Sequence, residues 1–258
     1  MEQPLRDHFG VAAACEDIRR FNKSVTYPAS DYLVGNAFAP YEALPRGQSL
    51  CGMILVNSLW NTSLRWHPDD CEVLSEEYEH HREELYQQTL ERIRPLRLHE
   101  EPDRVWELGA AMLRPLLESD RVKTRHYSFA TKFLHWHAPR HLPIMDSRTR
   151  KAIHSLQEEW GETEGLIRSD LANVPAESYV KEYRDWVRFY GRLLRCLTPD
   201  DRERLKATDA DSLPKPFHRD DTLLRILDKV FYIRGREESN KGRGFSRMNA
   251  DGMTRQVE

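Results

Sequence analysis

The sequence predicts an all-α domain of about ten helices, and three observations support that fold class. Apolar residues recur three and four positions apart along most of the chain, the spacing that gathers them on one face of a helix. No stretch of useful length alternates apolar and polar residues as a half-buried strand does, and no internal repeat is present. With 258 residues, the chain is long enough to bury a large core.

The N-terminal segment, residues 1–48, contains four prolines and several aromatic residues. One short helix is expected near residues 9–21, followed by an irregular stretch over residues 22–48 that wraps around the rest of the chain. We therefore expect the main helical domain to begin at residue 49.

That domain opens with a predicted helix over residues 49–64, whose apolar band is too broad for a surface helix and indicates a central position. Pro68 marks the break that follows. Residues 75–93 predict a long amphipathic helix with acidic residues in its first turns, where they suit the helix dipole. Asp103 is expected to cap a further helix over residues 105–117.

The second half of the chain continues the helical pattern. Helices are expected at residues 128–136, 146–160, 164–171, 177–197 and 221–232, with one more that starts at the cap Thr198 and has Pro199 in its first position. Residues 212–216 predict a proline-rich linker. From residue 236 apolar residues nearly vanish, so residues 236–258 are predicted to form a disordered tail and the helical domain to occupy residues 49–235.

The composition excludes several classes of protein. The four cysteines are scattered without a Cys-x-x-Cys pair, so neither a disulfide framework nor a zinc knuckle is indicated. His135 and His137 are two positions apart and point to nearly opposite sides of a helix, so no metal and no other cofactor is expected. No apolar run approaches the roughly 18 residues of a membrane span, and no secretion signal is evident. A cytoplasmic protein without membrane contact is the expectation.

Charge is distributed unevenly along the chain, although the formal net charge is only −3. Between residues 121 and 151 there are eight basic residues and one acid, Asp146, which gives 8 − 1 = +7. The eight are Arg121, Lys123, Arg125, Lys132, Arg140, Arg148, Arg150 and Lys151. Such a segment is typical of a nucleic-acid contact, with chance segregation of charge as the alternative.

One pair of residues within this segment indicates chemistry. Lys132 lies in an otherwise apolar and aromatic helical pattern, and an apolar setting lowers the pKa of a lysine and so favours a nucleophilic amine. Asp146 follows a short loop bounded by prolines and is placed to cap the next helix, where backbone N–H groups keep a carboxylate ionised. Two other readings stay open from spacing alone: Lys132 extends along apolar neighbours to solvent, and Asp146 is only a cap.

The same segment resembles a known family. The strings Phe129-Ala130-Thr131-Lys132-Phe133 and Pro143-Ile144-Met145-Asp146-Ser147 are similar to the catalytic segment of the helix-hairpin-helix DNA glycosylases, in particular the bacterial 8-oxoguanine DNA glycosylase-like branch. A less specific likeness extends to residues 55–62 and 225–231. The resemblance implies that Lys132 attacks C1′ of a nucleoside while Asp146 stabilises an oxocarbenium-like transition state. An attacking amine forms a Schiff base, so strand nicking by an AP lyase step is implied as well.

The resemblance also implies the residues that bind DNA. The target base must leave the duplex, and the expected stacking partners are Phe129, Phe133, Trp136 and Trp60. His137 and Asn57 are expected near the substrate, with bonds to backbone groups as the alternative for both. DNA phosphates would be held by Arg121, Lys123, Arg125, Arg148, Arg150 and Lys151.

One departure from the family pattern concerns the hairpin that binds the DNA backbone. The hairpin before the lysine usually carries a Leu-Pro-Gly-x-Gly string, and residues 121–128 contain neither glycine nor proline. The glycine hairpin is therefore expected to be degenerate or missing. Two hypotheses follow: a DNA N-glycosylase with AP lyase activity, and a catalytically silent helical nucleic-acid-binding protein. By analogy alone, a role of this protein in bacterial phage defence would make modified phage DNA a candidate substrate.

Overall fold

The computed structural model describes residues 2–60, 62, 68–122, 126–162, 165–167 and 175–253. Within these ranges the fold is all-α, as predicted, with twelve α-helices and no β-strand. The first half contains α1 (Glu2–Phe9), α2 (Val11–Asn22), α3 (Thr26–Ala37), α4 (Ser49–Trp60), and α5 (Pro68–His81), which continues through a π-helix (Arg82–Gln87) into α6 (Gln88–Ile93). The second half contains α7 (Pro102–Glu118), α8 (Tyr127–His137), α9 (Ser147–Trp160), α10 (Ala176–Cys196), α11 (Pro199–Ser212), a 3₁₀ turn (Lys215–Phe217) and α12 (Leu223–Met253).

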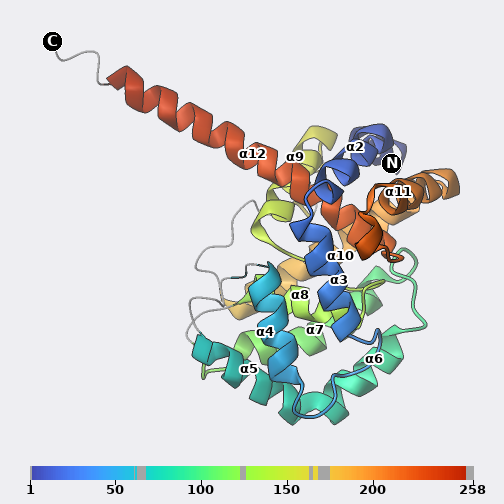
Figure 1. Cartoon of the computed structure of the whole chain (residues 1–258), viewed down its shortest axis with the longest axis vertical. Coiled ribbons are helices and arrows are strands. Elements are labelled where there is room, and N and C mark those ends of the chain that lie inside the picture. Colours follow the sequence, from blue (N-terminus) through green and yellow to red (C-terminus); the bar gives the residue numbers. More distant parts are fainter. Residues whose placement is uncertain are drawn as a thin grey trace.

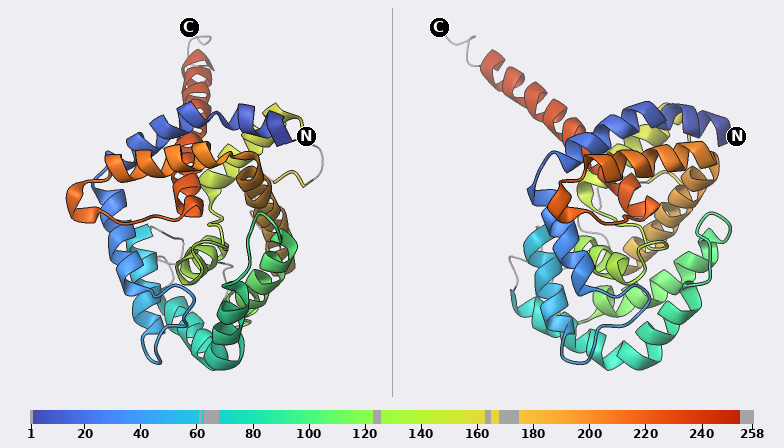
Figure 2. Two further views of the ribbon diagram at one scale, coloured as in Figure 1. Left: turned by 90° about the vertical axis from the view of Figure 1, so that its right-hand side faces the viewer. Right: turned by 45° about the vertical axis from the view of Figure 1, so that its right-hand side comes forward.

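Helix α8 lies at the centre of the molecule, with the other helices arranged around it (Figure 2). Every residue from Phe129 to His137 is buried, and the helix packs against α4 and α7. A helix with apolar residues on all sides is stable only when it is enclosed in this way. The sequence predicted the central position for residues 49–64 instead. That expectation is wrong, because α4 ends at Trp60 and leaves Ile54 48% exposed.

The N-terminal segment is part of the helical body. Residues 22–48, expected to be irregular, contain α3. Helix α2 packs against both α11 and α12, and α1 packs against α9 and α10. The first and last helices of the chain are therefore neighbours in space (Figure 1).

Helix α12 crosses α9 and α2 and then leaves the body (Figure 1). At Gly235 its backbone comes so close to α9 that an added Cβ would lie 1.9 Å from the carbonyl oxygen of Arg148. Only glycine permits this approach. Beyond it, residues 236–253, predicted to be disordered, continue as helix in the structure.

The helix ends explain where the predicted boundaries hold and where they shift. Asp146 caps α9 as predicted, and Thr198 forms a reciprocal capping box with Asp201 at the start of α11. Asp103 does not cap α7, because Pro102 takes the first helical position and moves the start toward the N-terminus. The helix expected at residues 164–171 lies mostly outside the described residues, and the described part, residues 165–167, is not helical.

Candidate active site

Lys132 and Asp146 meet in the interior. The Nζ atom of Lys132, on α8, lies 3.4 Å from Oδ2 of Asp146, at the start of α9. Their side chains are only 7% and 11% exposed. The pair is thus shielded from most of the solvent, and neither group has the freedom of a surface ion pair.

The loop between the two residues is held by hydrogen bonds to its backbone. The hydroxyl of Tyr183 donates to the carbonyl of Pro143, and Nε1 of Trp186 donates to that of Ile144, both at 3.0 Å. Next to Lys132, Oγ1 of Thr131 accepts the N–H of Met145 at 3.1 Å. These bonds fix the position of Asp146 relative to α8.

Asp146 is held in its ionised form. Its Oδ1 accepts the backbone N–H groups of Arg148 at 3.0 Å and Thr149 at 2.9 Å. Burial alone would raise the pKa of this carboxyl, but the ammonium of Lys132 and the donors from Thr149 and Arg148 outweigh it and lower the pKa. The arrangement can therefore stabilise positive charge that develops in front of Oδ2.

A cavity of about 180 Å³ opens beside the pair. Its aromatic members are Phe21, Tyr27, Trp60 and Tyr232, and its charged members are Asp31, Lys132, Asp146, Arg148, Arg225 and Asp228. This volume is smaller than the roughly 300–1,000 Å³ of pockets for drug-sized ligands. It suits one flat, polar-edged group.

The aromatic wall is built around Trp60. Its ring centroid lies 5.8 Å from Nζ of Lys132 and 4.4 Å from the guanidinium carbon of Arg225. Phe21 and Tyr27 also line the cavity and stack with ring centroids 4.9 Å apart, and the Tyr232 hydroxyl donates to that of Tyr27 at 3.1 Å. The guanidinium of Arg225 lies over both Trp60 and Phe21, so aromatic rings and this cation form one continuous part of the lining.

A buried ionic cluster that the sequence analysis did not select forms another wall. Nε and Nη2 of Arg225, on α12, donate to the two oxygens of Asp31, on α3, at 2.9 and 3.0 Å. Nη1 of the same guanidinium donates to Oδ2 of Asp228. A signal was present in the sequence, because Arg225 and Asp228 are charged and three positions apart within residues 223–233, where Lys229 is the only other charged residue.

Asp228 differs electrostatically from Asp146. Burial, with smaller contributions from the charges of Asp146 and Asp31, raises the pKa of Asp228 to about 7, although Arg225 and Lys132 act in the opposite direction. Its Oδ1 has a single long contact, 3.4 Å from the hydroxyl of Thr149. The cavity thus holds one carboxyl that stays ionised and one that is poised to carry a proton at neutral pH.

Two of the expected base-stacking residues lie elsewhere. Phe129 and Phe133 are fully buried in the core, where their rings stack 5.9 Å apart, and they do not line the cavity. They occupy the faces of α8 that its neighbouring helices cover. Trp136 is also buried and contacts the cavity only indirectly, because its ring packs edge-on against Trp60 at 5.6 Å. Trp60 is the expected stacking residue that does line it.

The two expected polar contacts are internal as well. Nδ1 of His137 donates to the carbonyl of Glu42 at 2.7 Å, and burial lowers the pKa of this histidine to about 4. Asn57 accepts a hydrogen bond from the hydroxyl of Thr62 at 2.5 Å. His137 therefore follows the alternative interpretation, a bond to a backbone group, whereas Asn57 bonds a side-chain hydroxyl, and neither residue lines the cavity.

The predicted phosphate-binding residues divide into four groups, of which Arg150 forms the last. Arg148 is exposed at the cavity mouth, with its guanidinium 4.8 Å from the ring centroid of Tyr232, and Lys151 is exposed on α9. Arg121 is paired with Glu76 of α5 at 2.6 Å. Lys123 and Arg125 lie outside the described residues.

Arg150 corrects the prediction most clearly. Its side chain is 1% exposed and forms an ion pair with Glu182 of α10, between the rings of Tyr127 and Trp186. It faces inward because it lies one turn after the cap of α9, on the side that packs against the core. Arg150 therefore stabilises the fold and cannot reach a phosphate.

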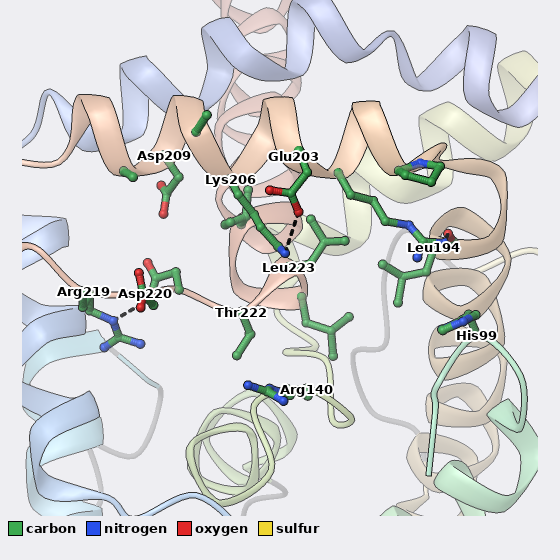
Figure 3. Close-up of a pocket in the computed structure, with 17 residues that line it drawn as sticks. His99, Arg140, Leu194, Glu203, Lys206, Asp209, Arg219, Asp220, Thr222 and Leu223 are labelled. Carbon is green, nitrogen blue, oxygen red and sulfur yellow. Dashed lines mark hydrogen bonds and ion pairs between the residues drawn. The ribbon is translucent and has the colours of Figure 1, made fainter. Parts of the chain in front are cut away.

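A larger cavity of about 900 Å³ lies between α11, the start of α12 and the loop that follows α8 (Figure 3). Its charged side chains balance, with the cations Arg140, Arg202, Lys206 and Arg219 against the acids Glu203, Asp209, Asp220 and Asp221. Ion pairs join Lys206 to Glu203 at 3.0 Å and Arg219 to Asp221 at 2.5 Å. The Lys206–Glu203 pair is exposed, at 49% and 73%. The buried amine of Lys229 binds Asp209 and Asp221 at 2.6 and 2.7 Å but does not itself line the cavity. The amine of Lys132, in contrast, lines the smaller cavity together with its carboxylate.

Within the described ranges, no group of three or more His, Cys, Asp or Glu residues is arranged to hold a metal ion. None of the helices in these ranges is both long and apolar enough to cross a membrane. Comparison of the chain with protein-family models, with curated proteins and with solved structures finds no match.

Proposed function

We propose that this protein is a DNA N-glycosylase that removes a modified or damaged base, with AP lyase activity arising from the same lysine. The observation that carries the proposal is the 3.4 Å approach of Lys132 Nζ to Asp146 Oδ2, beside a cavity with aromatic walls. An amine next to a fixed carboxylate is what attack on an acetal-like carbon requires.

The roles of the two residues follow from their positions. Asp146 keeps its charge because of its backbone donors, so it stabilises the positive charge that builds up on the sugar as the glycosidic bond lengthens. Lys132 attacks C1′ in its unprotonated form. Its Nζ atom lies 3.4 Å from the Asp146 carboxylate. Ring opening of the resulting adduct gives the Schiff base from which β-elimination proceeds.

The cavity supports the recognition of a base that has left the duplex. Its size suits one flat group, and Trp60 and Phe21 provide faces on which such a group stacks. Carboxyl and guanidinium groups at the edge supply hydrogen-bond partners for ring nitrogens and exocyclic groups. The exposed Arg148 at the mouth is placed to hold a backbone phosphate beside the extruded nucleotide.

Borohydride reduction in the presence of duplex DNA with an abasic site tests this proposal. The wild-type chain should form a stable protein–DNA adduct, and Lys132→Met should form none. The matched control is Lys181→Met, which removes an exposed lysine of α10 outside the cavity and should leave the adduct yield unchanged. Base release is then measured on duplexes that contain 8-oxoguanine, hypoxanthine or uracil.

A second candidate, a nucleic-acid-binding protein without catalysis, is favoured by one observation. The segment before α8 lacks the glycine hairpin of the resembled family, and Arg121 within it is paired with Glu76. Binding of the same duplexes without adduct formation or base release would support this second function over the first.

A further inference from the structure

Two carboxyl groups of the cavity are joined through one residue, Thr149. Its backbone N–H donates to Oδ1 of Asp146 at 2.9 Å, and its hydroxyl lies 3.4 Å from Oδ1 of Asp228. The two carboxyls belong to different helices, since Asp146 caps α9 and Asp228 lies on α12. Both line the cavity into which the base is proposed to enter.

Their surroundings push the two groups toward opposite protonation states. Asp146 accepts two backbone N–H groups and faces the ammonium of Lys132, so its pKa is lowered. In the described part of the chain no backbone N–H donates to Asp228, whose side chain is 4% exposed, and burial raises its pKa to about 7. Paired acidic groups whose pKa values are driven apart are the usual basis for dividing the acid and base roles of an active site.

The charged and titratable groups around Asp228 come from several helices. Arg225 on α12 and Lys132 on α8 favour its ionised form, whereas Asp146 and Asp31 favour its protonated form. Burial raises the pKa of Tyr190, on α10, and the charge of Asp228 raises it further, so this phenol lies near the carboxyl. Burial and the negative charges prevail for Asp228, so about half of these carboxyls carry a proton at pH 7.

Asp31 is the third buried acid of the cavity, but neither of its carboxylate oxygens is available to carry a transferable proton. Both of its oxygens accept from the guanidinium of Arg225, at 2.9 and 3.0 Å. Asp228 gives only Oδ2 to Arg225, and its Oδ1 faces a hydroxyl that can accept a hydrogen bond as well as donate one. A proton on Oδ1 of Asp228 is therefore compatible with every contact around it.

We propose that Asp228 is the general acid of this site and protonates the base as it leaves C1′. This assignment rests on the glycosylase function proposed above. The bond between C1′ and the base nitrogen breaks, and its electron pair remains with the base. The proton of Asp228 Oδ1 passes to the base, while the unprotonated amine of Lys132 forms its bond to C1′.

The charges balance in this step. Before the step, the ammonium of Lys132 gives one proton to water, which leaves a neutral amine. This amine, the neutral base on its sugar and the neutral carboxylic acid then give a secondary ammonium on the sugar, a carboxylate on Asp228 and a neutral free base. Asp146 keeps its negative charge throughout and offsets the positive charge on the sugar. No additional reactant is needed.

The test compares two substrates that differ only in whether a base must leave. Asp228→Asn should slow single-turnover base release by about 100-fold or more, the usual contribution of a general acid. With duplex DNA that carries an abasic site, the same variant should give the wild-type yield of borohydride adduct, because no leaving group needs a proton there. This second result also shows that the variant is folded.

The pH profile of base release provides an independent readout. The ratio of the wild-type rate to the Asp228→Asn rate should fall by about tenfold per pH unit above pH 7, because loss of a proton from Lys132 affects both proteins alike and cancels in the ratio. Asp31→Asn is the matched control, since it removes the other carboxylate on Arg225. It should keep the fall but move it to lower pH, because one negative charge near Asp228 is lost.

The outcomes separate the two proposals. Two outcomes would overturn the role of Asp228 without contradicting the function of Lys132. In the first, Asp228→Asn releases the base at the wild-type rate. In the second, this variant loses both base release and the abasic-site adduct. A wild-type chain that forms no adduct and releases no base would overturn the glycosylase function and this assignment together.

Discussion

Oδ1 of Asp146 caps helix α9 while Oδ2 of the same carboxylate lies 3.4 Å from Nζ of Lys132. One residue therefore links the start of a helix to the amine of the neighbouring one. Its two oxygens have separate tasks, and substitutions can separate them.

Asp146→Asn and Asp146→Ala should differ in stability but agree in activity. Asparagine is as good a cap as aspartate, whereas alanine removes the cap at a cost of about 1 kcal/mol in the free energy of unfolding. Both variants lose the charge that faces Lys132, so both should slow base release by about 100-fold or more. Urea unfolding and single-turnover kinetics measure the two effects. Wild-type activity in Asp146→Asn would mean that the residue is only a cap.

Arg225→Met should lower the free energy of unfolding by about 3–5 kcal/mol, because it leaves Asp31 and Asp228 buried without their shared cation. Arg121→Met removes an exposed pair with Glu76 and should cost at most about 1 kcal/mol. Urea unfolding at pH 7 compares the two variants. Equal costs would show that the cluster around Arg225 is solvated in the folded protein.

The buried histidines of α8 should make the protein sensitive to mild acid. Burial lowers the pKa of His137 to about 4 and that of His135 to about 3, while both titrate near 6.5 in the unfolded chain. Between about pH 6.5 and 4 the unfolded state therefore binds protons that the folded state does not, and stability falls as the pH falls.

His137→Asn isolates one of these contributions. An asparagine amide can replace Nδ1 as donor to the carbonyl of Glu42 but does not titrate. The free energy of unfolding of this variant should depend less steeply on pH between about 6 and 4.5, by about 1.4 kcal/mol per pH unit. A slope equal to that of the wild type would show that His137 is protonated in the folded protein.

Arg148 and Arg150 should have opposite phenotypes although only one residue separates them. Arg148→Ala removes an exposed cation at the cavity mouth, so it should weaken the binding of duplex DNA. The number of counterions released on binding, measured from the salt dependence, should fall by about one. Arg150→Met leaves Glu182 buried, so it should destabilise the fold by about 3–5 kcal/mol and leave DNA affinity unchanged. Fluorescence anisotropy at several salt concentrations, together with urea unfolding, measures both. Loss of DNA affinity in Arg150→Met would contradict the inward position of this side chain.

The sequence was informative where local rules decide the structure. The fold class and the caps at Asp146 and Thr198 follow from apolar spacing and from residues that act within one turn of a helix. The pairing of Lys132 with Asp146 was expected from the family resemblance, since spacing alone left it open. Trp60 and Arg148 were also selected and do line the cavity. These features depend on neighbours along the chain or on one short loop.

The other walls of the cavity depend on contacts that no local pattern encodes. Asp31 and Arg225 are 194 positions apart and meet only because α3 lies beside α12. The inward position of Arg150 depends on its ion pair with Glu182, which lies on a different helix, α10. Charge counted along the sequence made Arg150 a surface cation, because the count carries no information about which side of a helix is covered.

The cavity draws residues from Phe21 near the beginning to Tyr232 near the end of the described chain. During synthesis on a ribosome, α8 and α9 would leave the exit tunnel well before α12 does. The lysine and its aspartate could then meet, but the wall that Arg225, Asp228 and Tyr232 provide would still be missing. A growing chain would thus expose Lys132 in an incomplete cavity. The proposed activity would begin only after the last helix had docked.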